Sequence, residues 1–166
     1  MRAFAIVFLL LMVVNDSLAD EADDAKWTTL YNKEKAGVRY YKKGSYKKAY
    51  EKLLYPAQLG LKDAQYYLSF MYLKGQHVNQ SLATGMAWLG VACEIEVRQW
   101  QQTFDQIYNA LDVEQRKIID QKVAGYIQLY GMETQEMDCT RVARTGSRKV
   151  TVNCRKAVNA RWQPKK

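Results

Sequence analysis

The stretch from Ala57 to Cys93, AQLGLKDAQYYLSFMYLKGQHVNQSLATGMAWLGVAC, decides the fold class of this chain. Here, as in the surrounding sequence, alanine and tyrosine recur at intervals of three and four residues, which is the spacing of one packed face of a helix. Gly75 interrupts the pattern, and glycine is common just past the end of a helix. We therefore predict two helices joined by a short loop, a connection that favours an antiparallel pair.

The same helical pattern extends over residues 26–131, which contain a single proline, Pro56. Gly44 and Gly60 interrupt the pattern in the same way as Gly75, so we expect helices to end beside all three glycines. Helices of about 12–17 residues separated by short turns are typical of stacked antiparallel pairs. The predicted fold class is mainly α, a short α-solenoid of helix hairpins.

The last part of this helical region is predicted to close the stack with two further helices, over residues 98–110 and 113–130. Asp112 and Gln115 have the spacing of a capping box at the start of the second helix. Gly131 stands where that helix should stop. We expect this pair to cover the apolar face that two hairpins alone would leave open.

The small and aromatic positions of the opening stretch form a recognisable series: Ala57, Gly60, Ala64, Leu68, Tyr72, Gly75, Val78, Trp88, Ala92 and Cys93. In this series the stretch 57–93 resembles the Sel-1-like repeat, a relative of the tetratricopeptide repeat. It departs from that pattern at His77, where a second glycine is usual, and at Ser81, where the helix cap is usually aspartate. Thr84 and Gly85 replace the usual Lys-Ala pair. The resemblance implies helical hairpins that bind proteins or peptides.

A weaker copy of the same small and aromatic alternation covers about residues 30–56, with a shorter loop. The predicted organisation therefore has three parts. A signal peptide over residues 1–19 is followed by a helical repeat domain over residues 20–131. A basic hairpin and tail occupy residues 132–166.

The first part has the layout of a secretory signal. Arg2 supplies a positive start, residues 3–14 are twelve consecutive apolar residues, and Ser17 and Ala19 are small residues before a cleavage point. A helix needs about twenty residues to span a bilayer, so this run is too short, although an uncleaved anchor is the alternative reading. We expect an exported protein, periplasmic or secreted, with no membrane span in the mature chain.

The last part contains two of the three cysteines in the segment 139–154, CTRVARTGSRKVTVNC. Gly146, as the first central residue of the turn 145–148, suits a type II′ hairpin turn. That turn places Cys139 directly opposite Cys154, at a spacing that a disulfide can bridge. We predict a disulfide-stapled β-hairpin, stabilised by about 3 kcal/mol through loop closure. Cys93 is expected to be a free thiol in the core.

Charge is concentrated in the same part of the chain. Residues 139–166 hold nine basic and no acidic residues, while the whole chain has a net charge of +8 and Arg2 and Asp16 cancel, so residues 20–138 are left near −1. Such a tail is usually a solvated face, but it can also bind an anionic surface. The residues proposed for that contact are Arg144, Arg148, Lys149, Arg155 and Lys156.

Nine tyrosines lie between residues 31 and 72. Most are expected to fill the space between helix hairpins, and some to line a groove, because tyrosine combines large contact area with a hydroxyl group. The candidate partner-binding residues are Tyr41, Tyr67, Tyr72 and Trp88.

No catalytic motif is present. The sequence has no G-x-S-x-G, P-loop or H-E-x-x-H pattern. The acidic residues Glu94 and Glu96 are two apart, a spacing that does not bring carboxylates together on a helix. Neither this pair nor Glu133/Glu136 lies in a recognisable catalytic motif. His77 is the single histidine, with no metal-ligand cluster around it. We therefore expect no catalytic residues, no metal and no cofactor.

The function that these features favour is an exported, non-enzymatic protein–protein interaction module whose partner is an envelope protein or peptide. One alternative is a binder of anionic cell-envelope polymers that acts through the basic hairpin and tail. A second alternative is a small envelope hydrolase, which would need a polar pocket that the sequence does not reveal. Because export separates the protein from nucleic acid, no nucleic-acid partner is expected in vivo.

Overall fold

The computed structural model describes residues 25–143 and 150–157. The chain divides into two compact units, Met1–Asn32 and Lys33–Lys166. A helix over residues 25–42 runs across the boundary between them. The two units are described separately below.

Of the first unit, residues 25–32 are described, and all are helical. The rings of Trp27 and Tyr31, one helical turn apart, have centroids 6.1 Å from each other. The predicted signal peptide, residues 1–19, lies outside the described residues.

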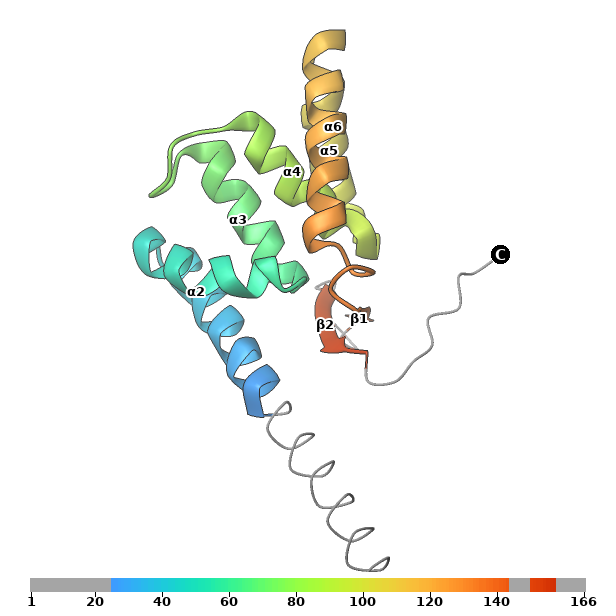
Figure 1. Ribbon diagram of the computed structural model, residues 1–166. Coiled ribbons are helices and arrows are strands. Elements are labelled where there is room, and N and C mark those ends of the chain that lie inside the picture. Colours follow the sequence, from blue (N-terminus) through green and yellow to red (C-terminus); the bar gives the residue numbers. More distant parts are fainter. Residues whose placement is uncertain (1–24, 144–149, 158–166) are drawn as a thin grey trace, which may run out of the picture. The chain divides into compact units, whose positions relative to one another are not determined.

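The second unit is mainly α-helical and ends in a β-hairpin, as predicted (Figure 1). After residues 33–42 come the helices α2 (Tyr46–Gln58), α3 (Lys62–Lys74), α4 (Leu82–Ala92), the 3₁₀ helix η1 (Cys93–Ile95), α5 (Arg98–Asn109) and α6 (Val113–Tyr130). The strands β1 (Met137–Ala143) and β2 (Val150–Lys156) follow. Helix α6 thus ends at Tyr130, two residues before the predicted start of the C-terminal part at residue 132.

The predicted helix ends at Gly44, Gly60 and Gly75 are all confirmed. At Gly60 both the conformation and the surroundings require glycine. Its φ of +88° lies in the left-handed region that L side chains avoid. A Cβ atom there would also lie 2.9 Å from Cγ of Met137, so the turn between α2 and α3 passes directly against the start of β1.

Two helix starts have the caps that the sequence predicts. The Ser81 hydroxyl oxygen accepts a hydrogen bond from the Thr84 amide at 3.2 Å, which caps α4. At α6, Asp112 Oδ1 accepts from the Gln115 amide at 2.8 Å, and the Asp112 amide donates to Gln115 Oε1 at 3.1 Å. The capping box is therefore confirmed. Gly131 ends α6 in an extended conformation.

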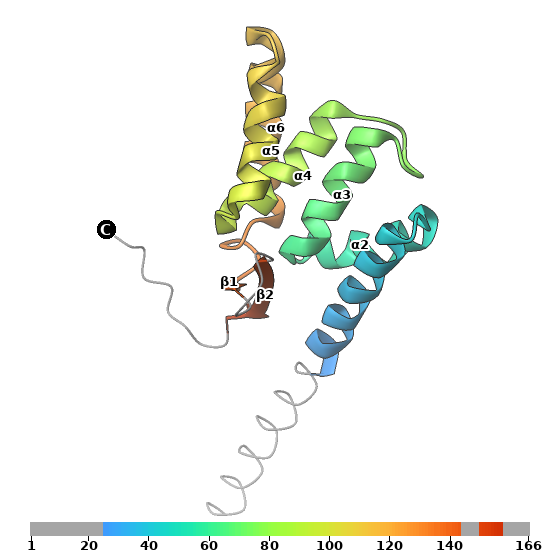
Figure 2. The same cartoon turned by 180° about the vertical axis from the view of Figure 1, so that it is seen from behind.

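Helix α2 packs on α3, and α3 packs antiparallel to α4 (Figure 2). Helix α4 also packs on α6, and the C-terminal ends of these two helices lie at the same side, where Glu94 meets Met132. Several of these contacts place a glycine of one helix against a branched side chain of the next. A Cβ atom on the glycine would lie 2.6 Å from a side-chain carbon in each of the pairs Gly37–Leu53, Gly85–Leu73 and Gly90–Val123. The missing side chain is what lets the helices approach this closely.

The β-hairpin has the predicted register. Strands β1 and β2 are antiparallel, Cys139 lies opposite Cys154, and the two form a disulfide. The predicted turn at 145–148 lies outside the described residues. Cys139 and Val152, on the face that meets the helices, pack against a cluster formed by Ala92, Ile95, Val97 and Trp100.

Within residues 25–143 and 150–157, no helix combines the length and apolar character needed to cross a membrane.

The glycine contacts give a first prediction. Gly90→Ala should lower the free energy of unfolding by about 1–3 kcal/mol, because the new methyl group overlaps Val123 and forces the helices apart.

Gly125→Ala, on α6, is the matched control. Its added Cβ meets nothing within 4 Å, so this change should raise stability by about 0.5–1 kcal/mol through helix propensity. Urea unfolding followed by circular dichroism measures both. Equal shifts for the two variants would contradict the packing described here.

Candidate functional site

A continuous series of aromatic rings crosses the helices of the second unit. We call it the aromatic row; its members are Tyr46, Tyr41, Tyr67, Tyr66, Phe70 and Trp100. The centroid of the Tyr41 ring lies 5.5 Å from that of Tyr46 and 5.0 Å from that of Tyr67. From Tyr66 the centroid distances are 5.4 Å to Tyr67 and 4.4 Å to Trp100. Four helical segments, 33–42, α2, α3 and α5, therefore contribute to one aromatic surface.

Most members of the aromatic row are partly exposed to solvent. Its four tyrosines and Phe70 are partly exposed, while Trp100 is buried beneath Tyr66, on which it stacks. Lysines lie at the side of the row: Lys42 Nζ is 5.6 Å from the ring centroid of Tyr67, and Lys74 Nζ is 5.5 Å from that of Phe70. The surface is thus aromatic with cationic flanks.

The phenol groups of Tyr41, Tyr66 and Tyr67 remain protonated at neutral pH. Burial, together with the neighbouring Tyr46 and Tyr67, raises the pKa of Tyr41 to about 12. Burial also raises the pKa of Tyr66 and of Tyr67. These hydroxyl groups can therefore donate hydrogen bonds to a partner.

The four predicted partner-binding residues do not share one surface. Tyr41 and Tyr67 are neighbours in the aromatic row. Tyr72 instead contacts Tyr50, with the two hydroxyl oxygens 3.2 Å apart, and its pKa is raised by burial and by that hydrogen bond. The ring of His77 packs edge-on against Tyr50 at 5.6 Å.

Trp88 lies in the core. Only 3% of its surface is exposed, and its ring stacks on Tyr130 with centroids 4.9 Å apart and meets Tyr126 at 5.0 Å. An indole so covered has no surface left to offer to a partner, so Trp88 joins α4 to α6. We therefore do not retain it as a contact residue.

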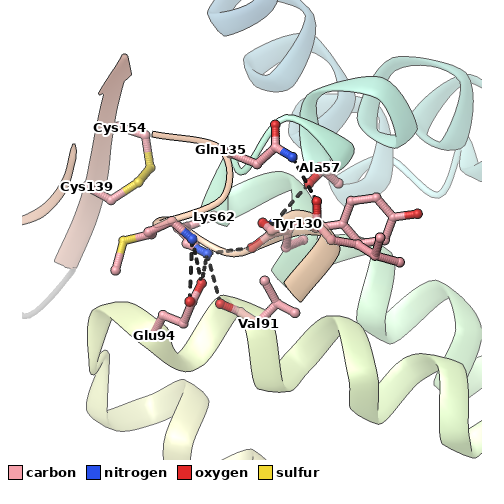
Figure 3. A network of polar contacts seen from close by, with 11 residues as sticks. Ala57, Lys62, Val91, Glu94, Tyr130, Gln135, Cys139 and Cys154 are labelled. Atoms are coloured by element: carbon pink, nitrogen blue, oxygen red, sulfur yellow. Dashed lines mark hydrogen bonds and ion pairs between the residues drawn. A yellow bond between two sulfur atoms is a disulfide. The ribbon is translucent and has the colours of Figure 1, made fainter. Parts of the chain in front are cut away.

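A buried polar network lies between the helices and the start of the hairpin (Figure 3). At its centre is Lys62, whose side chain is 0% exposed. Lys62 Nζ forms an ion pair with Glu94 Oε2 at 2.5 Å. It also donates to Gln65 Oε1 at 3.0 Å and to the Val91 carbonyl oxygen at 2.9 Å. All three donor positions of the ammonium group are occupied.

The network continues to three further segments. Gln65 Nε2 donates to the carbonyl oxygens of Ala57 and Tyr130, both at 2.9 Å. The Glu94 carboxylate accepts a hydrogen bond from the Met132 amide at 3.1 Å. One set of polar contacts thereby connects α2, α3, α4, η1, the end of α6 and the segment that leads into β1.

This network has the properties of a structural element. Burial lowers the pKa of Lys62, while Glu94 acts in the opposite direction and favours the charged form. With no exposed surface, Lys62 is closed to any substrate. The neighbouring Cys93 is the free cysteine, and burial raises the pKa of its thiol to about 12, which leaves little nucleophilic thiolate. In the described part of the chain, no group of three or more His, Cys, Asp or Glu residues could hold a metal ion.

Two of the five basic residues proposed for an anionic surface lie within the described residues, and both have acidic partners. Arg155 pairs with Asp138 at 2.9 Å, and Lys156 pairs with Glu136 at 2.9 Å. The other three, Arg144, Arg148 and Lys149, lie outside the described residues.

Sequence analysis did not identify Tyr46, Tyr66 or Trp100 as members of a common surface, nor Lys62 as a buried charge. The sequence pattern gave no signal for Lys62. Lys62, Gln65 and Ser69 follow the spacing of one helix face, which is typical of a solvent-exposed face. All three are nevertheless buried, and a buried polar group requires a hydrogen-bond partner.

Comparison of the chain with known protein families, with characterised proteins and with solved structures gives no match.

The network gives a second prediction. Glu94→Gln should lower the free energy of unfolding by about 3 kcal/mol, because it leaves a buried ammonium group without its counter-charge. This loss of stability should shrink as the pH rises, since Lys62 can then release its proton.

The control is Asp138→Asn, which removes a carboxylate from an ion pair whose side chains are 75% and 45% exposed. It should cost less than about 1 kcal/mol. Urea titrations at several pH values measure both. A cost for Glu94→Gln no larger than for Asp138→Asn would contradict the assignment.

Proposed function

We propose that this chain is an exported, non-enzymatic module that binds a protein partner through the aromatic row. The observation that carries the proposal is the row itself: partly exposed rings from three helical segments form one continuous surface, with Trp100 packed beneath them. Contiguous exposed aromatic surface is typical of protein–protein contacts.

The chemistry of the row suits a peptide segment. Tyrosine offers large contact area with few rotatable bonds, so little side-chain entropy is lost on binding. Its protonated hydroxyl groups can donate to the carbonyl oxygens of an extended backbone. The flanking Lys42 and Lys74 favour acidic side chains on the partner. We therefore propose an extended segment of an envelope protein, with apolar side chains interspersed with acidic ones.

The resemblance of residues 57–93 to the Sel-1-like repeat supports the same function. Helices α3 and α4 and the loop between them coincide with that unit. In such repeats the hairpins act as a scaffold, and binding falls on the surface that adjacent hairpins form together. The aromatic row has this placement, because it passes from residues 33–42 and α2 to α3 and α5.

Export is supported by two features of the chain. Residues 1–19 have the pattern of a secretory signal, and the disulfide between Cys139 and Cys154 is of a kind that persists in oxidising compartments. We propose the periplasm as the compartment.

Substitution of Tyr67 tests the proposed surface. Tyr67→Ala should weaken partner binding at least about tenfold, as expected for an aromatic residue at the centre of an interface. Tyr67→Phe keeps the ring and should lose less. Tyr55→Ala is the matched control, since Tyr55 is a 49% exposed tyrosine of α2 that is not part of the row. A photo-crosslinking phenylalanine at position 46, compared with one at position 55, identifies the partner in the native host, and its affinity for each purified variant is then measured.

The outcomes separate the proposal from its alternative. Crosslinks at position 46 that are absent at position 55, together with the affinity loss for Tyr67→Ala, support binding by the row. Equal crosslinking at both positions, or an affinity that Tyr67→Ala leaves unchanged, contradicts it. Retention on an anionic envelope polymer that disappears with added salt, and that Tyr67→Ala does not affect, would instead favour the basic tail.

A further inference from the structure

Helix α3 has no cap of its own. Its N-cap residue is Leu61, whose side chain cannot accept a hydrogen bond. The acceptor comes from a different helix: Glu34 Oε1 accepts from the Ala64 amide at 3.0 Å. A carboxyl group thus takes the place that a Ser or Asp side chain usually fills at a helix start. This hydrogen bond joins the segment 33–42 to the first turn of α3.

A second carboxyl group lies at the same place. Asp63 is in the first turn of α3, close enough to Glu34 that its charge acts on that group. Among the described residues, neither carboxyl group has a cation within ion-pair distance. Two carboxylates at one helix–helix contact without a counter-ion repel each other, so the contact is most stable when one of them holds a proton.

Several charged and titratable groups surround the pair. On the segment 33–42 they are Lys35 and Lys42, which favour the ionised forms of Glu34 and Asp63 respectively. On α3 they are Tyr66 and Tyr67, which experience the charge of Asp63. On α2, the Cβ of Lys52 lies close to Gly37, which is one turn further along the helix than Glu34.

Among the opposing effects on the pKa of these two carboxyl groups, burial is the largest. Burial, followed by the charge of Asp63, raises the pKa of Glu34 to about 8, although the Ala64 amide and Lys35 act against the shift. Burial raises the pKa of Asp63 to about 6, against the effect of Lys42. At neutral pH, Glu34 is therefore protonated and Asp63 is ionised.

We propose that Glu34 and Asp63 form a pH-sensitive latch, which holds the segment 33–42 against α3 while Glu34 is protonated and releases it as the pH rises. The protonated carboxyl group keeps a carbonyl oxygen for the Ala64 amide and carries no charge to oppose Asp63. Loss of the proton places two negative charges at one partly buried helix–helix contact. Release would also separate Tyr41, on this segment, from Tyr67 on α3, but the latch itself does not require that the aromatic row binds a partner.

The direction follows from proton linkage. A released Glu34 has its ordinary pKa of 4.5, and the latched one has a pKa of about 8. The latched state therefore binds a proton that the released state lacks between these pH values. Asp63, with an ordinary pKa of 3.8 and a latched pKa of about 6, adds a second such proton below pH 6, so the full stability of the latch is present only below 3.8. Latching should weaken by up to about tenfold for each pH unit between 6 and 8, more steeply below 6, and level off above 8.

Hydrogen exchange of the full-length protein at pH 5 to 9 tests the latch. After correction for intrinsic exchange rates, protection of the amides in 33–42 and of Ala64 should fall steeply with rising pH. Glu34→Gln imitates the protonated group, so its protection should stay nearly constant above about pH 6, where Asp63 has already titrated. Glu51→Gln, the same change at an exposed glutamate of α2, is the matched control and should behave like the unaltered protein.

A further variant tests the coupling between the two carboxyl groups. Asp63→Asn removes the repelling charge, so in carbon-detected NMR the Glu34 carboxyl group should titrate at a lower pH than in the unaltered protein. Because the ionised Glu34 then meets no second negative charge, protection of the segment 33–42 should also fall less between pH 5 and 9. A Glu34 titration at its ordinary pH in the unaltered protein would overturn the proposal. So would the same pH profile for Glu34→Gln and the unaltered protein, or a Glu34→Gln chain whose segment 33–42 is already released at pH 5.

Discussion

The ion pair between Lys62 and Glu94 is the constraint on which the rest of the second unit depends. A fully buried ammonium group is tolerated only if each of its hydrogen atoms has an acceptor and its charge has a counter-charge. Lys62 meets this condition with Gln65, Val91 and Glu94, which come from two helices and from η1. The position of α4 relative to α3, and the turn of chain that carries Glu94, are therefore fixed together.

The same network determines where the C-terminal part begins. Because Glu94 accepts from the Met132 amide, and Gln65 donates to the Tyr130 carbonyl oxygen, the end of α6 and the next residues are held against α3 and η1. Apolar packing alone tolerates small slides of one helix on another, whereas a hydrogen-bonded buried charge does not. The glycine contacts bring the helices close, and the network selects one arrangement among the close ones.

The parts of this structure that the sequence predicts are those encoded by residues near one another in the chain. The capping box joins Asp112 to Gln115, three residues away, and the hairpin register follows from a turn and two cysteines 15 residues apart. The contacts that sequence analysis missed join distant segments: Lys62 and Glu94 are 32 residues apart, and Gln65 and Tyr130 are 65 apart. Periodicity places a residue on a face of its helix, but it does not tell which neighbour covers that face. Tyr72 and Trp88 were therefore grouped with Tyr41 and Tyr67, although only the latter two lie together.

The β-hairpin is packed against the helices through its apolar face. Its disulfide keeps the two strands in register, so that Cys139 and Val152 face the cluster around Trp100. Arg141 adds a hydrogen bond to the Glu96 carbonyl oxygen at 2.8 Å, and the charges of Arg155 and Lys156 are met by Asp138 and Glu136. The apolar face of the hairpin is thus used within the protein, and part of its charge is neutralised there. Since Trp100 lies between the hairpin and Tyr66, bracing this cluster also supports one end of the aromatic row from below. The disulfide-bonded hairpin and the partly exposed row of rings are therefore connected through one packed cluster, so a change in the hairpin's packing would reach Tyr66 through Trp100.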